Sequence, residues 1–459
     1  MKRLGLLVFL LIGEQGFCFK SQSVFDGERI RFSVEFSPLE IKQEGTYSLV
    51  SSAECDDSFT QDRPRLPIKS IFLLIPPNSS VRNIKIIPEK VQIKGEYVIP
   101  EVSPPIPISQ DPQSAIRDPQ FFMGVFPEEV AEVSNIQHFK GYSILPLILY
   151  PAQYDSKALY WNKKIEIEIE IEKPKIASTP SFYREDEETI KGLVANPDLL
   201  SSYKRIQNSE FRIQNYQYVV ITDESLATSF QPLIDSKIQK GLTATITTTS
   251  WIYANYTGRD NQEKIRNFIK DYYTYYSTEY ILLGGDVEVV PYRGVYAKVD
   301  KYTESNMPCD LYFSCLDGDW DGDKDNIFGE LTDEVDLMPE VYVGRAPVNT
   351  GTETEGFVNK VISYIGSPTS SHLLDLLLIA YEADATSDCK VIKEEIASFI
   401  PIYFQVEKEY ESEGGVSMDR VIAQIEDGVG IINHDGHANY QVIPPFGSSV
   451  TDGRPIVSS

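Results

Sequence analysis

The chain has 459 residues, of which 42% are hydrophobic, so it is long enough for about three domains that each bury a core. It carries 68 acidic side chains against 42 basic ones, which gives a formal net charge of −26. A surface this negative repels phosphate backbones and anionic lipid headgroups, so the composition argues against a nucleic-acid-binding protein. It indicates a globular protein that stays soluble and meets divalent cations outside a cell, although a solvated acidic surface explains the same charge.

The first twenty residues have the pattern of a secretory signal peptide. Lys2 and Arg3 precede an apolar run over residues 4–12, and a polar stretch follows at residues 13–16. The run is too short to span a bilayer as a helix, and no later segment reaches about 18 uninterrupted apolar residues. We therefore predict a signal peptide at residues 1–20, an exported protein and no transmembrane segment.

The five cysteines are too scattered for a disulfide framework. Cys309 and Cys315 are near enough in sequence to pair, but isolated cysteines are more often buried and unreactive. We expect free, inert thiols at the positions that follow the signal peptide.

Residues 25–175 have the signals of β-strands, with alternating patterns, proline-rich turns and almost no helical periodicity. The clearest strand is residues 165–172, where isoleucine and glutamate alternate and place four isoleucines on one face of a sheet. A strand that buries one face packs in a sandwich. We predict an all-β, sandwich-like domain over residues 21–175.

The pattern changes twice after this domain. Residues 176–216 are polar and irregular and predict an interdomain linker. From residue 217 onwards, predicted strands alternate with predicted helices; the strands are 218–222, 280–283, 374–380 and 429–433, and the helices 260–276, 389–399 and 417–427. This alternation predicts an α/β domain with a mostly parallel sheet, whose functional groups gather at the carboxyl ends of the strands.

Two of the four histidines, His434 and His437, lie in one short turn at the end of the predicted strand 429–433. Histidine is the side chain that takes and returns a proton near neutral pH, so the turn is a candidate catalytic site. The alternative is a turn in which Asp435 and Gly436 shape the backbone and the histidines are incidental.

A crowded run of carboxylates predicts a calcium site. Its candidate ligands are Asp317, Asp319, Asp321, Asp323, Asp325 and Glu330. So many carboxylates repel one another unless a hard, oxygen-seeking cation neutralises them, and calcium accepts six to eight oxygens in flexible loops. The run does not form an EF-hand, because one register places Phe328 at the last ligand position and the other places Lys324 where the turn needs glycine. A merely solvated acidic loop is the alternative.

Other chemistries lack support. The sequence contains no glycine-rich phosphate loop, no CxxC pair and no HExxH helix, so nothing favours nucleotide binding, structural zinc or a zincin. Glycosidases place their acid and base on separate strand ends, which a single acidic run does not do.

Four blocks, at residues 280–291, 309–319, 339–347 and 433–437, together resemble the gingipain family of cysteine peptidases. The resemblance covers residues 217–459, and the β-rich region before them is similar to the prodomain of that family. It implies a caspase-like α/β domain preceded by a prodomain, and peptidase activity on proteins or peptides.

The resemblance also implies roles for individual residues. His437 matches the histidine that activates the nucleophilic cysteine, Gly436 is placed to offer an N–H group to the oxyanion, and Glu340 matches the acidic residue that orients the histidine. The acidic loop resembles a calcium-binding insertion. Ala438 departs from the pattern, because the family usually has a second glycine there.

The nucleophile itself is the main departure. In the family it lies at the end of the strand after the histidine, and no cysteine follows Cys389 in this sequence. Residues 454–459 look like the strand that leads into it. We therefore expect a peptidase domain, residues 217–459, that is incomplete at its C-terminus, and a chain that is inactive by itself.

Taken together, the sequence predicts a secreted or cell-surface cysteine endopeptidase with a Cys–His mechanism and structural calcium, whose cell-surface association would involve C-terminal regions missing from this chain. The alternative is a non-catalytic, calcium-dependent binding or adhesion module built on a peptidase fold.

Overall fold

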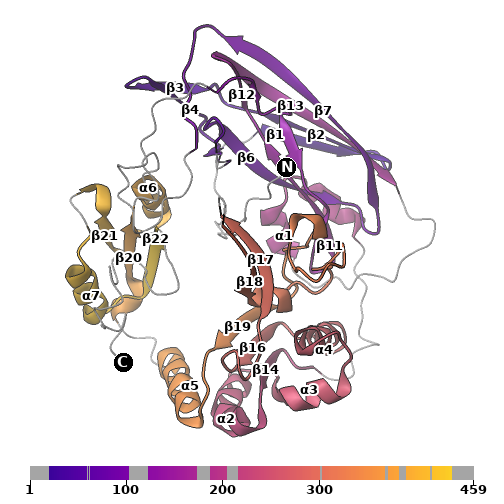
Figure 1. Ribbon diagram of the computed structural model, residues 1–459, viewed down its shortest axis with the longest axis vertical. Coiled ribbons are helices and arrows are strands. Elements are labelled where there is room, and N and C mark those ends of the chain that lie inside the picture. The colour runs from indigo at the N-terminus through magenta and orange to yellow at the C-terminus, as the bar shows by residue number, and fades with distance from the viewer. Residues whose placement is uncertain are drawn as a thin grey trace. The chain divides into compact units, whose positions relative to one another are not determined.

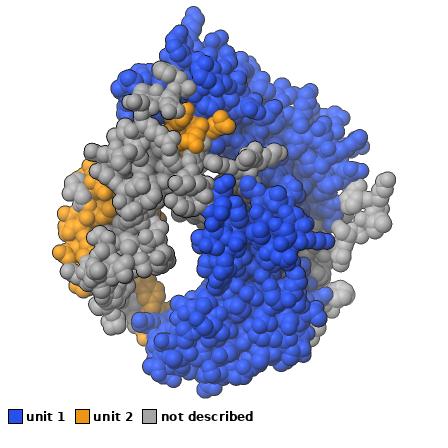
Figure 2. Space-filling model, in the orientation of Figure 1, with its two compact units in different colours: residues 1–60, 64–100, 121–362 blue, residues 61–63, 101–120, 363–459 orange. Residues whose placement is uncertain are grey.

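The computed structural model describes residues 20–58, 60, 62–102, 122–172, 187–203, 215–299, 302–366, 371–381, 389–413 and 416–436. The chain divides into two compact units, which Figure 2 colours separately. Unit 1 comprises residues 1–60, 64–100 and 121–362, and unit 2 comprises residues 61–63, 101–120 and 363–459. Residues 1–19 of the predicted signal peptide, His437 and the predicted strand 454–459 lie outside the described residues.

The N-terminal region of unit 1 is built from antiparallel strands (Figure 1). They are β1 (Lys20–Phe25), β2 (Arg29–Glu35), β3 (Glu40–Glu44), β4 (Tyr47–Ser51), β5 (Asp56–Asp57), β6 (Pro67–Ile75), β7 (Ser80–Ile93), β8 (Val125–Phe126), β9 (Ala131–Val133), β10 (Gln137–Phe139), β11 (Tyr142–Leu149), β12 (Ala152–Asp155) and β13 (Ala158–Glu172). One sheet has the order β1-β2-β13-β12-β8 with β7 paired to β13, and a second has the order β10-β11-β6-β5 with β9 paired to β11. β3 and β4 form a separate hairpin. In the described part of residues 20–172, every regular element is a strand.

The alternating segment of β13 shows why these sheets stack. Ile165, Ile167 and Ile169 are fully buried, while the glutamates between them are partly exposed. The three isoleucines share one core cluster with apolar residues of β2, β6 and β11, so the two sheets bury their inner faces against each other. The predicted two-residue period is confirmed in this strand.

The segment predicted as a linker contains ordered structure in residues 187–203. It forms α1 (Glu187–Leu193) and the 3₁₀ helix η2 (Pro197–Ser202). Ile190 and Leu199 join the core of the β-rich region, and the Asn196 side chain hydrogen-bonds both the N–H (2.7 Å) and the carbonyl (2.9 Å) of Leu74 in β6. The segment is polar on average, but a few of its apolar residues stand at helical spacing and pack onto the sandwich.

The second part of unit 1 is an α/β layer. Its elements are β14 (Tyr218–Thr222), α2 (Glu224–Gln239), β15 (Ala244–Thr248), α3 (Thr249–Asn255), α4 (Asn261–Tyr276), β16 (Tyr280–Gly284), β17 (Arg293–Val299), β18 (Tyr302–Cys309), η3 (Asp310–Phe313), η4 (Leu331–Asp333), β19 (Tyr342–Ala346) and α5 (Gly351–Gly366). The sheet order is β15-β14-β16-β19, and all of its pairs are parallel. β17 and β18 form an antiparallel hairpin beside it.

Helices cover both faces of this sheet, and β14 shows how the sequence achieves it. Val219 and Ile221 pack with α3 and α4, whereas Val220 packs with α2 and α5. A strand buried on both faces reads as a continuous apolar run, which is how residues 218–222 were predicted. The predicted helix 260–276 is α4, with Asp260 as the N-cap that accepts a hydrogen bond from the N–H of Glu263 (2.8 Å).

Unit 2 contains a second, smaller parallel sheet. Its elements are η5 (Ser371–Leu374), β20 (Asp375–Ala380), α6 (Cys389–Phe399), β21 (Gln405–Tyr410), η6 (Glu411–Glu413), α7 (Met418–Asp427) and β22 (Ile431–Asp435). The order is β21-β20-β22, with α6 packed on one face of β20 and α7 on the other. The strand predicted at 429–433 spans Ile431–Asp435 and so lies two residues later. Gly430, just before it, passes so close to the carbonyls of His372 and Leu373 that a Cβ would lie 2.6 Å from each.

The described helices include none that is both long and apolar enough to cross a membrane. The two parallel sheets agree with the predicted alternation of strands and helices. The more specific expectation, a caspase-like arrangement of the whole domain, stays a prediction.

Candidate active site and acidic loop

The predicted catalytic turn begins at the end of β22. His434 and Asp435 are the last two residues of the strand, and the turn starts at Gly436 rather than at His434. Gly436 has φ +154°, and a Cβ there would lie 2.7 Å from the Cβ of Tyr381. Glycine is therefore required where the chain leaves the sheet beside Tyr381. His437, the predicted general base, follows directly but lies outside the described residues.

A buried lysine holds the end of this strand. Lys393 of α6 is only 3% exposed, and its Nζ donates a hydrogen bond to Oδ1 of Asn433 (2.6 Å) and lies 3.5 Å from Oδ2 of Asp435. Lys393 is not among the residues predicted from the sequence. Its signal is a cation on the apolar stripe of a helix, four residues after Cys389 and three before Ile396.

Glu340, the predicted orienting acid, is buried in unit 1 at 3% exposure. Its Oε2 accepts a hydrogen bond from the N–H of Leu316 (2.7 Å), whereas its Oε1 is buried without a hydrogen-bond partner. Burial, reinforced by the negative charge of Asp317, raises the pKa of Glu340 to about 9. Its carboxyl group is therefore protonated at neutral pH. The predicted role of Glu340, to orient His437, stays a prediction because His437 lies outside the described residues.

Four of the six predicted calcium ligands lie together in the acidic loop. One carboxylate oxygen from each of Asp321, Asp323 and Asp325 lies within 4.8 Å of the other two. Glu330 is beside them: its pKa is raised, first by burial and then by the negative charges of Asp325 and Asp323. This is the arrangement of like charges from which the sequence predicted a cation.

The aspartates also shape the loop itself. Asp319 accepts a hydrogen bond from the N–H of Asp321 (3.1 Å), and Asp325 accepts one from Ile327 (2.7 Å). Asp321 is buried and forms an ion pair with Arg259, which supplies one positive charge to the cluster. Asp319 thus acts as a local backbone acceptor, outside the group formed by the other three aspartates.

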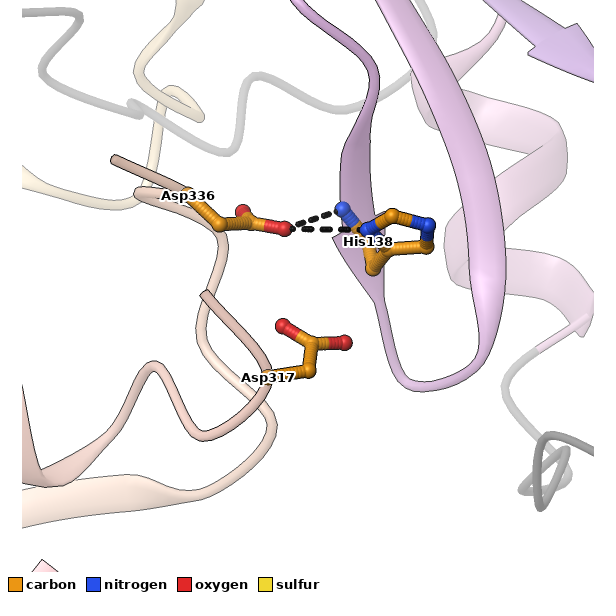
Figure 3. Close-up of side chains that lie close together, drawn as sticks. All are labelled: His138, Asp317 and Asp336. Atoms are coloured by element: carbon orange, nitrogen blue, oxygen red, sulfur yellow. Dashed lines mark hydrogen bonds and ion pairs between the residues drawn. The ribbon is translucent and has the colours of Figure 1, made fainter. Parts of the chain in front are cut away.

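Asp317 belongs to a different cluster, together with His138 and Asp336 (Figure 3). His138 is in β10 of the β-rich region, and its backbone N–H donates to Oδ2 of Asp336 (2.5 Å). Oδ1 of Asp336 accepts from the N–H of Met338 (3.0 Å). Asp317 is exposed as a residue, but protein around its carboxyl group excludes enough solvent to raise the pKa of Asp317 to about 6, and the charge of Asp336 adds to this. His138 and Asp336 are 198 residues apart, so no local pattern reveals this cluster.

The described cysteines are not activated nucleophiles. Cys55, Cys309, Cys315 and Cys389 are not joined in disulfides, and Cys315 and Cys389 are buried. Burial raises the pKa of Cys55 to about 12 and raises that of Cys315 well above its ordinary value. A thiol needs a lowered pKa to attack a carbonyl carbon at neutral pH, so these sites do not fit that role.

Residues 212–453 match the family model described as peptidase family C25. Lys-gingipain of Porphyromonas gingivalis is 22% identical over 438 residues, which cover 90% of this chain and 23% of that protein. Lys-gingipain W83 of the same organism is 23% identical over 406 residues, which cover 84% of this chain and 22% of that protein. The chain therefore spans 22–23% of the length of these curated relatives.

Two solved structures are similar to parts of the chain. The crystal structure of the Arg-specific cysteine proteinase gingipain R aligns with 50% of this chain and 49% of that chain, at 20% identity and a TM-score of 0.38. A structure from a study of the zymogenic latency of gingipain K from Porphyromonas gingivalis aligns with 34% of this chain and 93% of that chain, at 17% identity and a TM-score of 0.29.

Proposed function

Because the chain belongs to peptidase family C25, we propose that it is part of a secreted cysteine-type endopeptidase in which residues 21–175 form the prodomain. The observation that carries the proposal is the family match itself, which runs from residue 212 to residue 453 and so includes both parallel sheets. The substrates are proteins or peptides. Export follows from the predicted signal peptide, and the two gingipains that resemble this chain are consistent with peptidase chemistry.

In the proposed mechanism His437 takes the proton from the thiol of a nucleophilic cysteine, and the thiolate attacks the peptide carbonyl carbon. The N–H of Gly436 donates to the oxyanion that forms on the carbonyl oxygen. Lys393 supports this turn by holding Asn433 and Asp435 at the end of β22. We propose that the nucleophile is a cysteine other than the five in this sequence, since the described thiols are buried or have raised pKa values.

Glu340 is proposed to orient His437. A carboxyl group that is neutral at pH 7 hydrogen-bonds an imidazole, and the imidazolium that forms when the thiol loses its proton lowers the pKa of a nearby carboxyl group. The unpartnered Oε1 of Glu340 is the atom available for this contact. The role therefore depends on His437 lying close to Glu340 in the active enzyme.

We further propose that calcium binds in the acidic loop through Asp321, Asp323, Asp325 and Glu330. These carboxylates are close together, and their mutual repulsion falls when a divalent cation binds. Gly322 makes the loop compact, because its Cα lies so near Asp333 that a Cβ would be 2.8 Å from the Asp333 carbonyl oxygen. The ion stabilises the loop and takes no part in bond cleavage.

The test uses the protein translated from the complete reading frame of the gene. It should cleave casein and lose this activity on alkylation with iodoacetamide. His437→Ala should lower kcat/KM by at least about 10²-fold, because general-base catalysis contributes that much or more. His434→Gln is the matched control, since it removes the other histidine of the same segment, and should retain most activity.

Two results would contradict the proposal. Casein cleavage that survives both alkylation and His437→Ala would exclude a Cys–His mechanism. A complete reading frame that supplies no further cysteine would leave the peptidase chemistry without a nucleophile, and a calcium-dependent binding module would then be the better interpretation.

A further inference from the structure

We propose that His138, Asp317 and Asp336 bind a divalent first-row transition-metal ion of the Zn²⁺ class, which joins the hairpin β10–β11 of the β-rich region to the acidic segment of the α/β layer. Figure 3 shows that the three side chains approach one another from separate stretches of chain. The inference is independent of peptidase activity and concerns a different group from the calcium loop.

The distances fit a metal with short bonds. One ligand atom from each residue lies within 4.8 Å of the other two, and Nδ1 of His138 is 3.4 Å from Oδ2 of Asp336. Zinc binds nitrogen and oxygen at about 2.0–2.2 Å, so ligand atoms at two corners of a tetrahedron lie roughly 3.3 Å apart. The histidine and Asp336 already have about this separation, with Oδ2 of Asp336 also accepting the backbone N–H of His138, and an oxygen of Asp317 lies within 4.8 Å of both ligand atoms.

The charges around the cluster are unbalanced. In the described residues, no lysine or arginine forms an ion pair with Asp317 or Asp336, and the Asp336 side chain is only 5% exposed. The positive groups whose charges act on Asp317 are His138 and Lys270. Burial raises the pKa of Glu340, and the negative charges of Asp317 and Asp336 raise it further, so Glu340 is neutral near pH 7 and adds no charge to the cluster. Two carboxylates facing one imidazole leave a net negative charge even when His138 is protonated, and a divalent cation would neutralise it.

A glycine and a glutamine side chain hold the three residues close together. A Cβ at Gly318 would lie 2.8 Å from the Cβ of Asp336, so only glycine allows the two acidic stretches to run this close. The Gln137 side chain donates to the carbonyl of Val335 (3.2 Å) and accepts from the N–H of Leu337 (2.7 Å), which fixes β10 against the segment on both sides of Asp336. The convergence is therefore held by neighbours that are not themselves ligands.

The ligand set identifies the class of metal. An imidazole nitrogen is a good ligand for Zn²⁺ and its neighbours in the first transition row, whereas calcium takes oxygen ligands. Three protein ligands leave one tetrahedral position for water. The Asp321 group has carboxylate oxygens only. We therefore expect the His138 cluster to prefer Zn²⁺ and the Asp321 group to prefer Ca²⁺.

The experiment titrates the 459-residue chain with Co²⁺ and then Zn²⁺ in a buffer that contains saturating Ca²⁺. Bound Co²⁺ has a visible d–d spectrum, so the titration gives the number of bound equivalents. Displacement of the bound Co²⁺ by Zn²⁺ then gives the relative affinity of the two ions. His138→Asn should lose one bound equivalent or weaken it by at least about tenfold. The matched control His372→Asn removes a histidine of unit 2 and should bind Co²⁺ as the unmodified chain does. Asp323→Asn should also keep Co²⁺ binding, while its calcium binding weakens.

Asp336→Asn is the second ligand variant, and its amide oxygen retains the acceptor for Met338. Circular dichroism in chelator checks that each variant is folded. The proposal fails if the unmodified chain binds no Co²⁺ at about 100 µM, if His138→Asn leaves binding unchanged, or if Ca²⁺ displaces the bound Co²⁺ at equal concentration.

Discussion

The acidic loop around Asp321 and the cluster at His138 both concentrate carboxylates, but they are assembled in different ways. In the loop, the aspartates are two residues apart and accept hydrogen bonds from their own backbone neighbours. In the cluster, the ligand atoms come from residues up to 198 positions apart, and Gln137 and Gly318 hold them together. One arrangement is local and the other depends on tertiary structure.

The two regions balance their negative charge in different ways. The loop has an arginine partner and an open surface, so calcium adds to an existing ion pair between Arg259 and Asp321. The cluster has a partly exposed histidine and a buried glutamate, and its negative charge is relieved by protonation or by a metal. Substitutions should therefore separate the two regions.

The largest expected effect is at Glu340, in the metal-free protein with chelator present. The unfolded chain releases the glutamate proton above about pH 4.3, whereas the folded chain keeps it up to about pH 9, so raising the pH favours unfolding. Ionisation of Glu340 should make stability fall by about 1 kcal/mol per pH unit between pH 5 and pH 8, and Glu340→Gln should make the slope shallower by that amount. Urea denaturation at four pH values measures it. Parallel slopes for the two proteins would show that Glu340 ionises normally in the folded state.

Two glycine substitutions should affect the two regions separately. Gly318→Ala and Gly322→Ala each place a Cβ 2.8 Å from a neighbouring atom, of Asp336 and of Asp333 respectively, and each should cost about 1–3 kcal/mol. Gly318→Ala should also reduce the stabilisation of the protein by Zn²⁺ and leave its stabilisation by Ca²⁺ unchanged. Gly322→Ala should reduce the stabilisation by Ca²⁺ and leave that by Zn²⁺ unchanged. Thermal melts with each ion measure both. Equal loss of both responses in both variants would mean that the two regions form one site.

Arg259→Gln should have an intermediate effect. It leaves the buried carboxylate of Asp321 without its cation, but the arginine is 44% exposed, so solvent screens the pair and the cost is about 1–2 kcal/mol. Calcium should restore part of this stability, because it supplies the missing charge. The control is Arg29→Gln, which removes an exposed pair with Glu170 and should change stability by less than about 0.5 kcal/mol. A loss that calcium does not reduce would place the ion elsewhere.

The smallest expected effect is at Asp319. Because its side chain bonds the N–H of Asp321 and lies outside the group of converging carboxylates, Asp319→Asn should change the calcium Kd by less than about twofold. Asp323→Asn removes a converging carboxylate and should weaken calcium binding by about tenfold. Calorimetric titration distinguishes them. A tenfold loss at Asp319 would return it to the ligand set that the sequence predicted.

Local patterns account for what the sequence predicted well. The alternation around Ile167 predicted a strand with one buried face, and the run at residues 218–222 predicted β14 to the residue. Helix α6 has the predicted bounds, because its apolar stripe begins and ends within the same segment. Periodicity depends only on neighbours along the chain, so it can be read without knowing the fold.

The rest required tertiary structure. Nothing near His138 in the sequence indicates that Asp336 is its neighbour, and the burial that raises the pKa of Glu340 comes from segments around Leu316 and Asp317. Asp317 looked like the first member of an evenly spaced series, but the chain turns at Gly318 and directs it to the other cluster. The roles predicted for His437 and Gly436 stay predictions.

Met338 has a practical consequence for fragments of this chain. It is 3% exposed and belongs to the core of the β-rich sandwich, while Val335, three residues earlier, belongs to the core on the α3–α4 face of the first parallel sheet. A recombinant fragment that starts near residue 215 would expose this methionine to water. The fragment would also lack Gln137, which hydrogen-bonds the carbonyl of Val335 and the N–H of Leu337. Poor solubility of such a fragment would therefore report a missing partner surface, and replacing Met338 with a polar residue is the first modification to make when the α/β layer is expressed alone.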